Sequence, residues 1–378
     1  MQNLLVNLRN ELDAKGIKKT ELANCLDVDP SVVTKIFKGD RQISLSCLMK
    51  ILILLNKGKK SIEEAIVKYI GYAKHQKMRE SMEYLTLVGE FDVLKVFIDK
   101  EKKSSRSENR EYAFVYDVIR KRYTTKLTPK TYYNQIITKS KKVKTLEMEI
   151  LTEILLCQAM YQSGDYRVLH QRLAAIEEKI LEVKNKQIKN SLKMRLKEAI
   201  AVISLQRCLI NNTRSVCLEI LDNLKEDEAF SLLKVNAYLK IGESYIFEEG
   251  KYELAKKYLE KTLEVLGDPK YQGLKEKKWL VQCTLAFLKI YHWRDLDTLG
   301  KLHPAEAAFL KIKQGKCADA ERLLLKLQKR NAELTDIQTF YLGLARNDKE
   351  LIKKSLEMCE ASGNIFYAQL PKIYLGLI

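Results

Sequence analysis

The chain contains 378 residues and is strongly basic, with 67 Lys and Arg residues against 49 Asp and Glu residues and a formal net charge of +18. A chain of this length can form about two or three domains, or one small domain followed by an array of repeats. The excess of basic residues favours a polyanionic partner such as nucleic acid. The first sixty residues hold 11 basic and 6 acidic side chains, so most of the excess lies beyond them.

Cysteine usage and apolar run length limit the class of protein. The eight cysteines are scattered without a CxxC pair, and most lie within apolar helical patterns, which predicts reduced, buried thiols and a cytoplasmic location. The N-terminus is too polar for a signal peptide, and the apolar run at 51–55 is far too short to span a bilayer, so we expect no membrane partner. With five prolines and no alternating β-pattern, the sequence predicts an all-α protein.

The stretch 18–43 predicts two short helices joined by a tight turn. Asp27 occupies the turn, where a left-handed backbone is expected; glycine suits that conformation best, but aspartate tolerates it. Asp29 and Pro30 form a start signal for the second helix, and Gly39 closes that helix. Because a helix-turn-helix places its second helix in the DNA major groove, this stretch predicts a DNA reader of the Cro type. The alternative is an ordinary helical hairpin.

The predicted DNA contacts are the outward-facing polar and basic side chains of this stretch. They are Lys18, Lys19, Thr20, Ser31, Thr34, Lys35, Lys38 and Arg41. A helix over 3–15 precedes the stretch, and Ser44 caps a further apolar helix. Together these elements predict a helix-turn-helix domain over residues 1–56, followed by a basic linker at 57–61.

Residues 62–363 form a long series of amphipathic helices with an internal repeat. A glycine is followed five residues later by an apolar or small residue of the next helix, at Gly89, Gly164, Gly250 and Gly315. The copy over 236–269 resembles a tetratricopeptide repeat, with one extra residue in its turn. We expect Gly242 to let the two helices of this copy approach closely, with Ala255 at the same crossing. Unrelated hairpins that share a turn are the alternative.

Repeats of this kind stack into a superhelix whose concave face is lined by the first helix of each repeat. Such a groove commonly takes an extended peptide, which side-chain amides hold by its backbone. Asn236 and Glu243 fall at inward positions of the clearest copy, and Gln206 and Gln282 are comparable on neighbouring repeats. Each of these taken singly is more often a solvated polar residue than a ligand contact.

The segment 118–144 carries nine Lys or Arg residues and no acid, interleaved with Tyr123, Tyr132 and Tyr133. Such a segment can form a second nucleic-acid surface, because basic groups attract phosphates and aromatic rings stack on bases. We prefer the simpler interpretation of a solvated basic loop and helix face.

The end of the chain, residues 364–378, is unusually apolar and lacks a charged tail. A terminal repeat normally needs a polar outer face, so this segment predicts a capping or dimerisation helix. The side chains expected in a dimer contact are Tyr374, Leu375, Leu377 and Ile378. A homodimer also agrees with the reader, since Cro-like readers span two half-sites in pairs.

No set of catalytic residues is apparent in the sequence. Phosphate-binding glycine loops, HExxH and GxSxG are absent, and the four histidines at 75, 170, 292 and 303 lack metal-ligand spacing. The run HWRD at 292–295 could suggest acid–base chemistry, but we expect Trp293 to pack within a helix. We therefore predict that the protein is not an enzyme and needs no cofactor or metal.

A Cro-type reader joined to a long degenerate tetratricopeptide array resembles the RRNPP family of Gram-positive peptide-pheromone receptors. Within it, the chain is most similar to the AimR-type arbitrium receptors of Bacillus-group phages. Two stretches support that similarity: KVNAYLKIGESYIFEEGKYELA at 234–255 and FYAQLPKIYL at 366–375. The architecture covers essentially the whole chain, whereas these matches are local.

The resemblance implies a homodimeric transcription regulator that binds double-stranded promoter DNA in the cytoplasm of a bacterial host. A short secreted peptide would control it, and with it the choice of a phage between lysis and lysogeny. Family ligands lie in the repeat groove and near the segment before the terminal Leu-Pro. This adds Asn364, Phe366 and Tyr367 to the predicted peptide contacts, although Phe366 and Tyr367 suit plain core positions equally well.

Two alternatives remain beside this interpretation. One is another RRNPP quorum-sensing regulator of the PlcR, Rgg or NprR type, with a different peptide and direction of control. The other is a helical adaptor whose reader-like domain docks onto protein. For a peptide-controlled regulator, we expect the peptide to shift the population of dimer geometries, because a ligand that binds two states equally shifts nothing.

Overall fold

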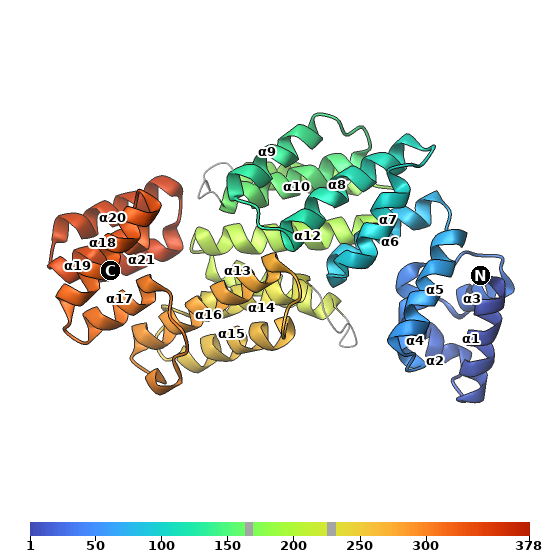
Figure 1. The fold of residues 1–378 in the computed structure, drawn as a ribbon, viewed down its shortest axis with the longest axis horizontal. Coiled ribbons are helices and arrows are strands. Elements are labelled where there is room, and N and C mark those ends of the chain that lie inside the picture. Colours follow the sequence, from blue (N-terminus) through green and yellow to red (C-terminus); the bar gives the residue numbers. More distant parts are fainter. Residues whose placement is uncertain (163–168, 225–231) are drawn as a thin grey trace. The chain divides into compact units, whose positions relative to one another are not determined.

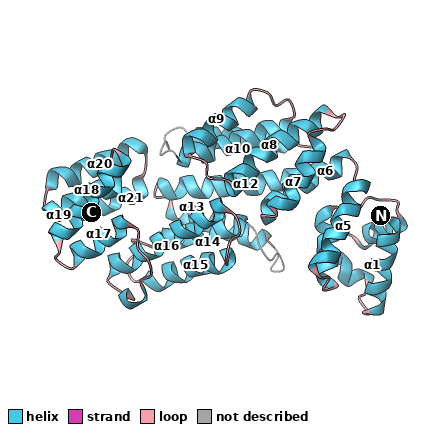
Figure 2. Ribbon diagram, in the orientation of Figure 1, coloured by secondary structure: helices cyan, strands magenta, loops and turns pink. Residues whose placement is uncertain are grey.

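The computed structural model describes residues 1–162, 169–224 and 232–378, and all regular structure within them is helical (Figure 2). The predicted all-α class is confirmed. The chain divides into two compact units. The first consists of Met1–Arg120 and Val143–Met148, and the second consists of Lys121–Lys142 and Glu149–Ile378.

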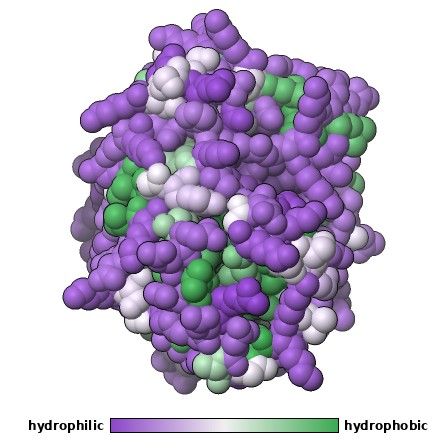
Figure 3. Space-filling view, turned by 90° about the vertical axis from the view of Figure 1, so that its right-hand side faces the viewer, coloured by the Kyte–Doolittle hydropathy of each residue, from purple (hydrophilic) through white to green (hydrophobic). Residues whose placement is uncertain are grey.

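The first unit contains the N-terminal helices of the chain (Figure 1). They are α1 (Gln2–Ala14), α2 (Lys19–Leu26), α3 (Pro30–Lys38), α4 (Leu45–Leu54), α5 (Lys59–Tyr72), α6 (His75–Val88), α7 (Phe91–Glu101) and the first part of α8 (Ser107–Thr124). Fully buried side chains such as Leu5, Ile43 and Leu48 hold the first four helices together. Hydrophilic side chains cover most of the face that Figure 3 presents, with separate apolar areas between them.

The turn between α2 and α3 has the geometry that its residues predict. Asp27 adopts a left-handed conformation with φ of 57°. The carboxylate of Asp29 accepts a hydrogen bond of 2.7 Å from the backbone N–H of Ser31, and Pro30 opens α3. Gly39 ends α3 with φ of 86°. The helix-turn-helix is therefore confirmed as local structure.

The linker predicted at 57–61 is shorter than expected. The helix α5 begins at Lys59, so three of the five linker residues form its first turn. Gln42 holds the end of the same helix, because its Nε2 donates to the carbonyl of Tyr72 at 3.1 Å. The first compact unit accordingly extends well beyond residue 56 and includes helices α5–α7, which the sequence assigned to the repeat array.

The second unit is a succession of helices in which neighbours along the chain pack against each other (Figure 1). Its helices after α8 are α9 (Pro129–Ser140), α10 (Leu146–Gln162), α11 (Leu169–Glu182), α12 (Lys186–Gln206), α13 (Ile210–Asn223), α14 (Leu232–Ser244), α15 (Tyr252–Leu266), α16 (Gln272–His292), the 3-10 turn Leu296–Thr298, α17 (Pro304–Lys313), α18 (Cys317–Asn331), α19 (Asp336–Arg346), α20 (Lys349–Ser362) and α21 (Ile365–Leu375). This sequential packing is the pattern of a repeat array.

The repeated glycine marks a left-handed turn between paired helices. Gly89, Gly250 and Gly315 adopt φ values of 81°, 70° and 75°. They lie between α6 and α7, α14 and α15, and α17 and α18. Gly164 lies outside the described residues. A glycine at these turns costs no steric strain, which explains why the same residue recurs.

Helices α14 and α15 form the clearest repeat, and Gly242 lies at their crossing. A Cβ atom at Gly242 would come within 2.9 Å of Leu259 Cγ and 3.1 Å of the Leu259 backbone nitrogen. Ala255 and Leu259 are fully buried beside it. The close approach predicted at Gly242 is confirmed.

The C-terminal helix α21 packs back onto earlier helices of the second unit. It contacts α12, and Phe366 and Leu370 share a buried cluster with Leu205. The ring of Phe366 lies 5.1 Å from that of Phe247. The residues beyond the cluster differ in burial, since Tyr374, Leu377 and Ile378 are exposed whereas Leu375 packs against the cluster.

Two smaller expectations need correction. Trp293 does not pack within a helix: it ends α16 in a left-handed conformation, and 46 % of its surface is exposed. All eight cysteines are free, but only Cys157, Cys217 and Cys359 are buried, and the others are half-buried. Among the described helices, none has the length and apolar character needed to cross a membrane.

The crossing at Gly242 makes a prediction about stability. Gly242→Ala should lower the free energy of unfolding by about 1–3 kcal/mol, because the added methyl group overpacks the contact with Leu259. Gly300→Ala is the matched control, since a Cβ at Gly300 meets nothing within 4 Å. Thermal or denaturant unfolding of both variants tests this. Equal stability of the two variants would contradict the close packing.

Candidate functional site

The first candidate surface surrounds α3. Of the eight predicted DNA contacts, Thr34 is half-buried and the rest are exposed: Lys18, Lys19, Thr20, Ser31, Lys35, Lys38 and Arg41. The hydroxyl of Thr34 donates to the carbonyl of Pro30 at 3.3 Å, so this hydroxyl is already engaged by its own helix.

Charges from both helices of the turn meet at Asp29. The hydrogen bonds from Ser31 hold the pKa of the Asp29 carboxyl below its usual value, and the positive charges of Lys19 and Lys35 lower that pKa further. Lys19 belongs to α2 and Lys35 to α3, so the turn brings basic side chains from two helices together. The N-terminal end of α3 therefore presents polar and basic groups to solvent.

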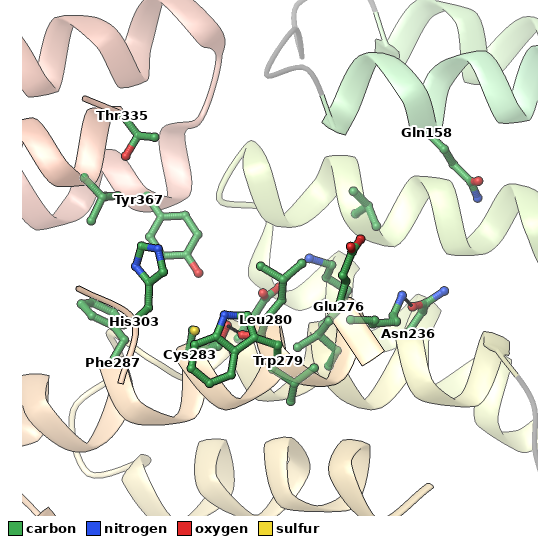
Figure 4. A pocket seen from close by; sticks show the side chains of 18 of the residues that line it. Gln158, Asn236, Glu276, Trp279, Leu280, Cys283, Phe287, His303, Thr335 and Tyr367 are labelled. Carbon is green, nitrogen blue, oxygen red and sulfur yellow. Dashed lines mark hydrogen bonds and ion pairs between the residues drawn. The ribbon is translucent and has the colours of Figure 1, made fainter. Parts of the chain in front are cut away.

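The second candidate site is a cavity of about 870 Å³ within the second unit. Side chains from the end of α8 and from α10, α12, α14, α16, α17, α19 and α21 line it. Gln158 and Asn236 lie toward one end of the cavity, and His303, Phe287 and Tyr367 lie toward the other (Figure 4). Trp279 and Leu280 line the part between, and 64 % of Leu280 is exposed. A volume of this size is in the range of ligand-binding pockets.

Asn236 links three helices at the first end of the cavity. Its Nδ2 donates to a carboxylate oxygen of Glu198 on α12, and its Oδ1 accepts from the ammonium of Lys277 on α16. Burial lowers the pKa of Lys277 to about 8, although the charge of Glu198 opposes that change. The amide thus holds an acid and a base at fixed places in the cavity wall.

Beside this link, Lys240 and Glu243 of α14 form a buried ion pair with an Nζ–Oε2 distance of 2.6 Å. These residues are spaced i and i+3 on one helix face, where oppositely charged side chains meet. The pair neutralises both charges locally, so it leaves the balance of charge in the cavity unchanged.

Arg122 also belongs to the cavity wall. Its Nη1 donates to Gln158 Oε1 at 2.7 Å, and its guanidinium lies 4.8 Å from the centre of the Tyr132 ring. The segment 118–144 is therefore not merely a solvated basic surface, because Arg122 lines the cavity and Tyr132 is buried. The expectation for that segment is wrong at these two residues.

The position of Arg122 depends on a glycine of α16. A Cβ at Gly273 would come within 2.6 Å of the Arg122 carbonyl oxygen and 3.0 Å of the Tyr123 carbonyl oxygen. Only a residue without a side chain allows the two backbones to approach so closely. Gly273 therefore fixes the end of α8 against α16 and with it the base of the Arg122 side chain.

His303 and Glu306 of α17 lie toward the other end of the cavity. Burial raises the pKa of the Glu306 carboxyl. The Nδ1 atom of His303 lies 3.3 Å from Glu306 Oε2. This nitrogen accepts a hydrogen bond from the backbone N–H of Ala305, so it carries no proton that it could donate to the carboxylate. Among the described residues, no group donates a hydrogen bond to Glu306 Oε2.

Residues 62–376 match the family described as AimR transcriptional regulator-like. The chain belongs to this family. The matched range does not include the helix-turn-helix of α2 and α3, which precedes residue 62. It also shows that the protein is a member of a family of regulators rather than enzymes, as its sequence predicted.

Two relatives and two solved structures are similar to this chain. An uncharacterized protein of Bacillus anthracis is 35 % identical over 235 residues, which span 62 % of this chain and 86 % of the relative. The AimR transcriptional regulator of Bacillus phage phi3T is 25 % identical over 305 residues, 79 % of this chain and 76 % of that regulator.

A structure described as phAimR-Ligand has a TM-score of 0.71 at 22 % identity, covering 89 % of this chain and 98 % of that chain. A structure of selenomethionine phAimR has a TM-score of 0.65 at 22 % identity, covering 99 % and 96 %. At this level of identity the likeness concerns the fold. Because the second alignment spans nearly the whole chain, the likeness in fold includes the helix-turn-helix as well as the array.

The seven predicted peptide contacts of this AimR-family chain separate into two groups. Asn236, Glu243 and Tyr367 line the cavity. The other four lie outside its lining. Phe366 and Gln206 are buried, Gln282 is exposed, and Asn364 donates to Asp336 Oδ2 at 3.2 Å. The sequence left open whether Phe366 is a peptide contact or a core residue, and in the structure it is a core residue.

Most of the polar lining of the cavity was not predicted from sequence. The charged and amide residues concerned are Arg122, Gln158, Glu198, Lys240, Glu276, Lys277, His303, Glu306 and Gln338. One usable signal was the pair Lys240 and Glu243, two charges on the inward face of the clearest repeat. The others come from helices without a recognisable repeat pattern, so no spacing relates them to each other.

Burial of Glu306 makes a prediction about pH. A carboxyl whose pKa is raised on folding destabilises the folded state above the ordinary carboxyl value of 4.5 and not below it. Glu306→Gln should therefore raise the melting temperature at neutral pH, by about 2 °C or more for about 1 kcal/mol in a domain of this size. The gain should vanish in acid. Thermal unfolding across pH measures this, and a gain that is independent of pH would contradict it.

Proposed function

We propose that this chain is a transcription regulator that binds double-stranded promoter DNA as a homodimer and is controlled by a short signalling peptide. The observation that carries the proposal is the pairing, in one AimR-family chain, of an exposed basic helix-turn-helix with a polar cavity in a helical array. Similarity to the AimR regulator of phage phi3T supports a role in a phage lysis–lysogeny decision in the bacterial host cytoplasm.

In this proposal α3 enters the major groove. Ser31 and Lys35 are exposed on α3 and read base edges, with Thr34 contributing contact through its methyl group. Contacts to phosphate oxygens position the reader, and they come from Lys18, Lys19, Thr20, Lys38 and Arg41. The net positive charge of the chain supports such contacts.

We propose the exposed end of α21 as the dimer contact, through Tyr374, Leu377 and Ile378, with Leu375 behind them. The three side chains are 42 %, 60 % and 69 % exposed, and all three present apolar surface. Burial of such surface favours association. Two readers on one duplex then bind far more tightly than either alone, because the second binding step becomes intramolecular.

We propose that the peptide lies in the cavity along α14 and α16. Asn236, Glu243 and Tyr367 then contact it together with Glu198, Lys277 and Gln338, and Trp279 and Leu280 supply apolar surface. The peptide changes DNA affinity only if it binds one dimer geometry better than the other. Its effect is therefore a shift between two geometries of the paired readers.

A mobility-shift assay on DNA upstream of the gene tests the reader. Thr34→Ala combined with Lys35→Ala should weaken binding about 10- to 100-fold, because a good base contact is worth about 1–3 kcal/mol. Lys257→Ala is the control, since Lys257 is an exposed lysine of the array. Unchanged promoter binding by the double variant would instead favour a helical adaptor whose reader-like domain docks onto protein.

The same assay, with and without a synthetic peptide encoded by the adjoining small gene, tests the sensor. Asn236→Ala should bind promoter DNA like the parent chain but fail to respond to the peptide, because both Glu198 and Lys277 lose their shared partner. The expected loss of peptide affinity is about 10-fold or more. A normal response of this variant would exclude the cavity as the peptide site.

A further inference from the structure

The wall of the cavity near Asn236 holds two cations whose donors are largely unused. Within the described residues, Arg122 donates hydrogen bonds only through Nη1, to Gln158 and Tyr132, and its Nη2 and Nε groups have no acceptor. The ammonium of Lys277 has three N–H donors and one acceptor, Asn236 Oδ1. Both side chains line the cavity.

The acids near these cations make their hydrogen bonds with other groups. Glu198 is the acid that acts most strongly on Lys277, and it also faces Arg122. Lys240 and Glu243 act on Lys277 with opposite signs and pair with each other. Glu276 lines the cavity from the same helix as Lys277 and accepts from Gln272. Among the acids of the described lining, Glu243 pairs with Lys240, and neither Glu198 nor Glu276 accepts a hydrogen bond from Arg122 or Lys277.

The pKa of Lys277 reflects mainly the burial of its ammonium. Burial lowers its pKa to about 8, Glu198 and Glu243 raise it, and the positive charges of Arg122 and Lys240 lower it. A buried cation is stabilised when an anion with suitable hydrogen-bond acceptors lies against it. An anionic ligand group that lies against Lys277 would therefore stabilise its protonated form and use its remaining donors.

The two cations are held in place before any ligand binds. Gly273 brings α16 against the backbone of Arg122, and Gln158 holds the guanidinium. Asn236 holds Lys277. Such preorganisation lowers the entropic cost of binding. A guanidinium matches the two oxygens of a carboxylate in particular, because its N–H groups form a planar fork.

We propose that Arg122 and Lys277 bind a carboxylate of the ligand, which for a signalling peptide is its free C-terminus or an acidic side chain. This inference rests on the proposed function, since it assigns one chemical group of the peptide to one end of the cavity. Binding of the carboxylate to Lys277 also makes the affinity for the ligand depend on pH. The carboxylate favours protonated Lys277, so above about pH 8 the ligand binds together with a proton.

The experiment uses the full-length chain and three pools of short random-sequence synthetic peptides. One pool lacks Asp and Glu and ends in a free carboxylate, the second has the same sequences with a C-terminal carboxamide, and the third is amidated but contains Asp and Glu. Mass spectrometry identifies the peptides that the protein retains. Fluorescence then gives the affinity of the strongest binder, because Trp279 lines the cavity. Trp293→Phe removes the other of the two tryptophans.

We expect retention from a pool that carries carboxylates, at about 10- to 100-fold higher affinity than the matching peptide without one. Retention from the first pool identifies the C-terminus as the source, and retention from the third identifies a side chain. Arg122→Gln and Lys277→Met should each remove most of this preference. Lys275→Met, an exposed lysine on the same helix, should keep it.

Lys277→Arg separates a binding role from a structural one. Arginine keeps its charge at any accessible pH, so this variant should bind like the parent chain below about pH 8 and lose the pH dependence above it. In the parent chain, affinity for the retained peptide should fall by up to about tenfold per pH unit above that point. An equal pH dependence in both chains would overturn the proposal.

The outcomes also separate this inference from the function on which it rests. Equal retention of peptides from all three pools, with the fluorescence of Trp279 still reporting binding, would overturn the carboxylate site and leave peptide binding intact. Retention of no pool would overturn both. A preference for acids that persists in Arg122→Gln and Lys277→Met would place carboxylate recognition elsewhere and overturn the assignment to these residues.

Discussion

A single buried amide, that of Asn236, links three helices around the cavity of the second unit. The side chain of Asn236 ends in an NH2 group, which donates to Glu198, and an oxygen, which accepts from Lys277. The amide therefore joins α12, α14 and α16 and determines which wall of the cavity is acidic and which is basic. Neither an acid nor a base at this position could serve both neighbours, because a carboxylate cannot donate to Glu198 and an ammonium cannot accept from Lys277.

This arrangement explains how an array of simple helices can hold a specific site. The apolar contacts between consecutive helices, such as that of Gly242 with Leu259, form the scaffold and bring no polar group to the cavity. The polar groups come from one position in each of several helices. A ligand that contacts several of these helices at once can therefore favour one relative arrangement of them, which is the property that a sensor requires.

Local features of this chain were predictable from sequence, and features that combine distant helices were not. Asp27, Asp29 and Gly39 specify their turn because each acts on its own backbone. Gly242 was predictable because its repeat contains both helices of the crossing. Arg122 and Lys277 are 155 positions apart in the chain, and only the packing of α8 against α16 brings them to one cavity. The segment around Arg122 therefore gave the appearance of a solvated basic surface.

The contact of α21 with α12 has a consequence for synthesis of the chain. Leu205 and Phe247 leave the ribosome long before Phe366, yet the three side chains belong to one packed region. Until α21 is released, the apolar surface on α12 and beside α14 lacks the cover that α21 provides. The earlier helices can pack with their neighbours during translation, but this part of the core closes only once α21 has left the ribosome. A nascent or truncated chain would expose the uncovered surface to chaperones and to aggregation.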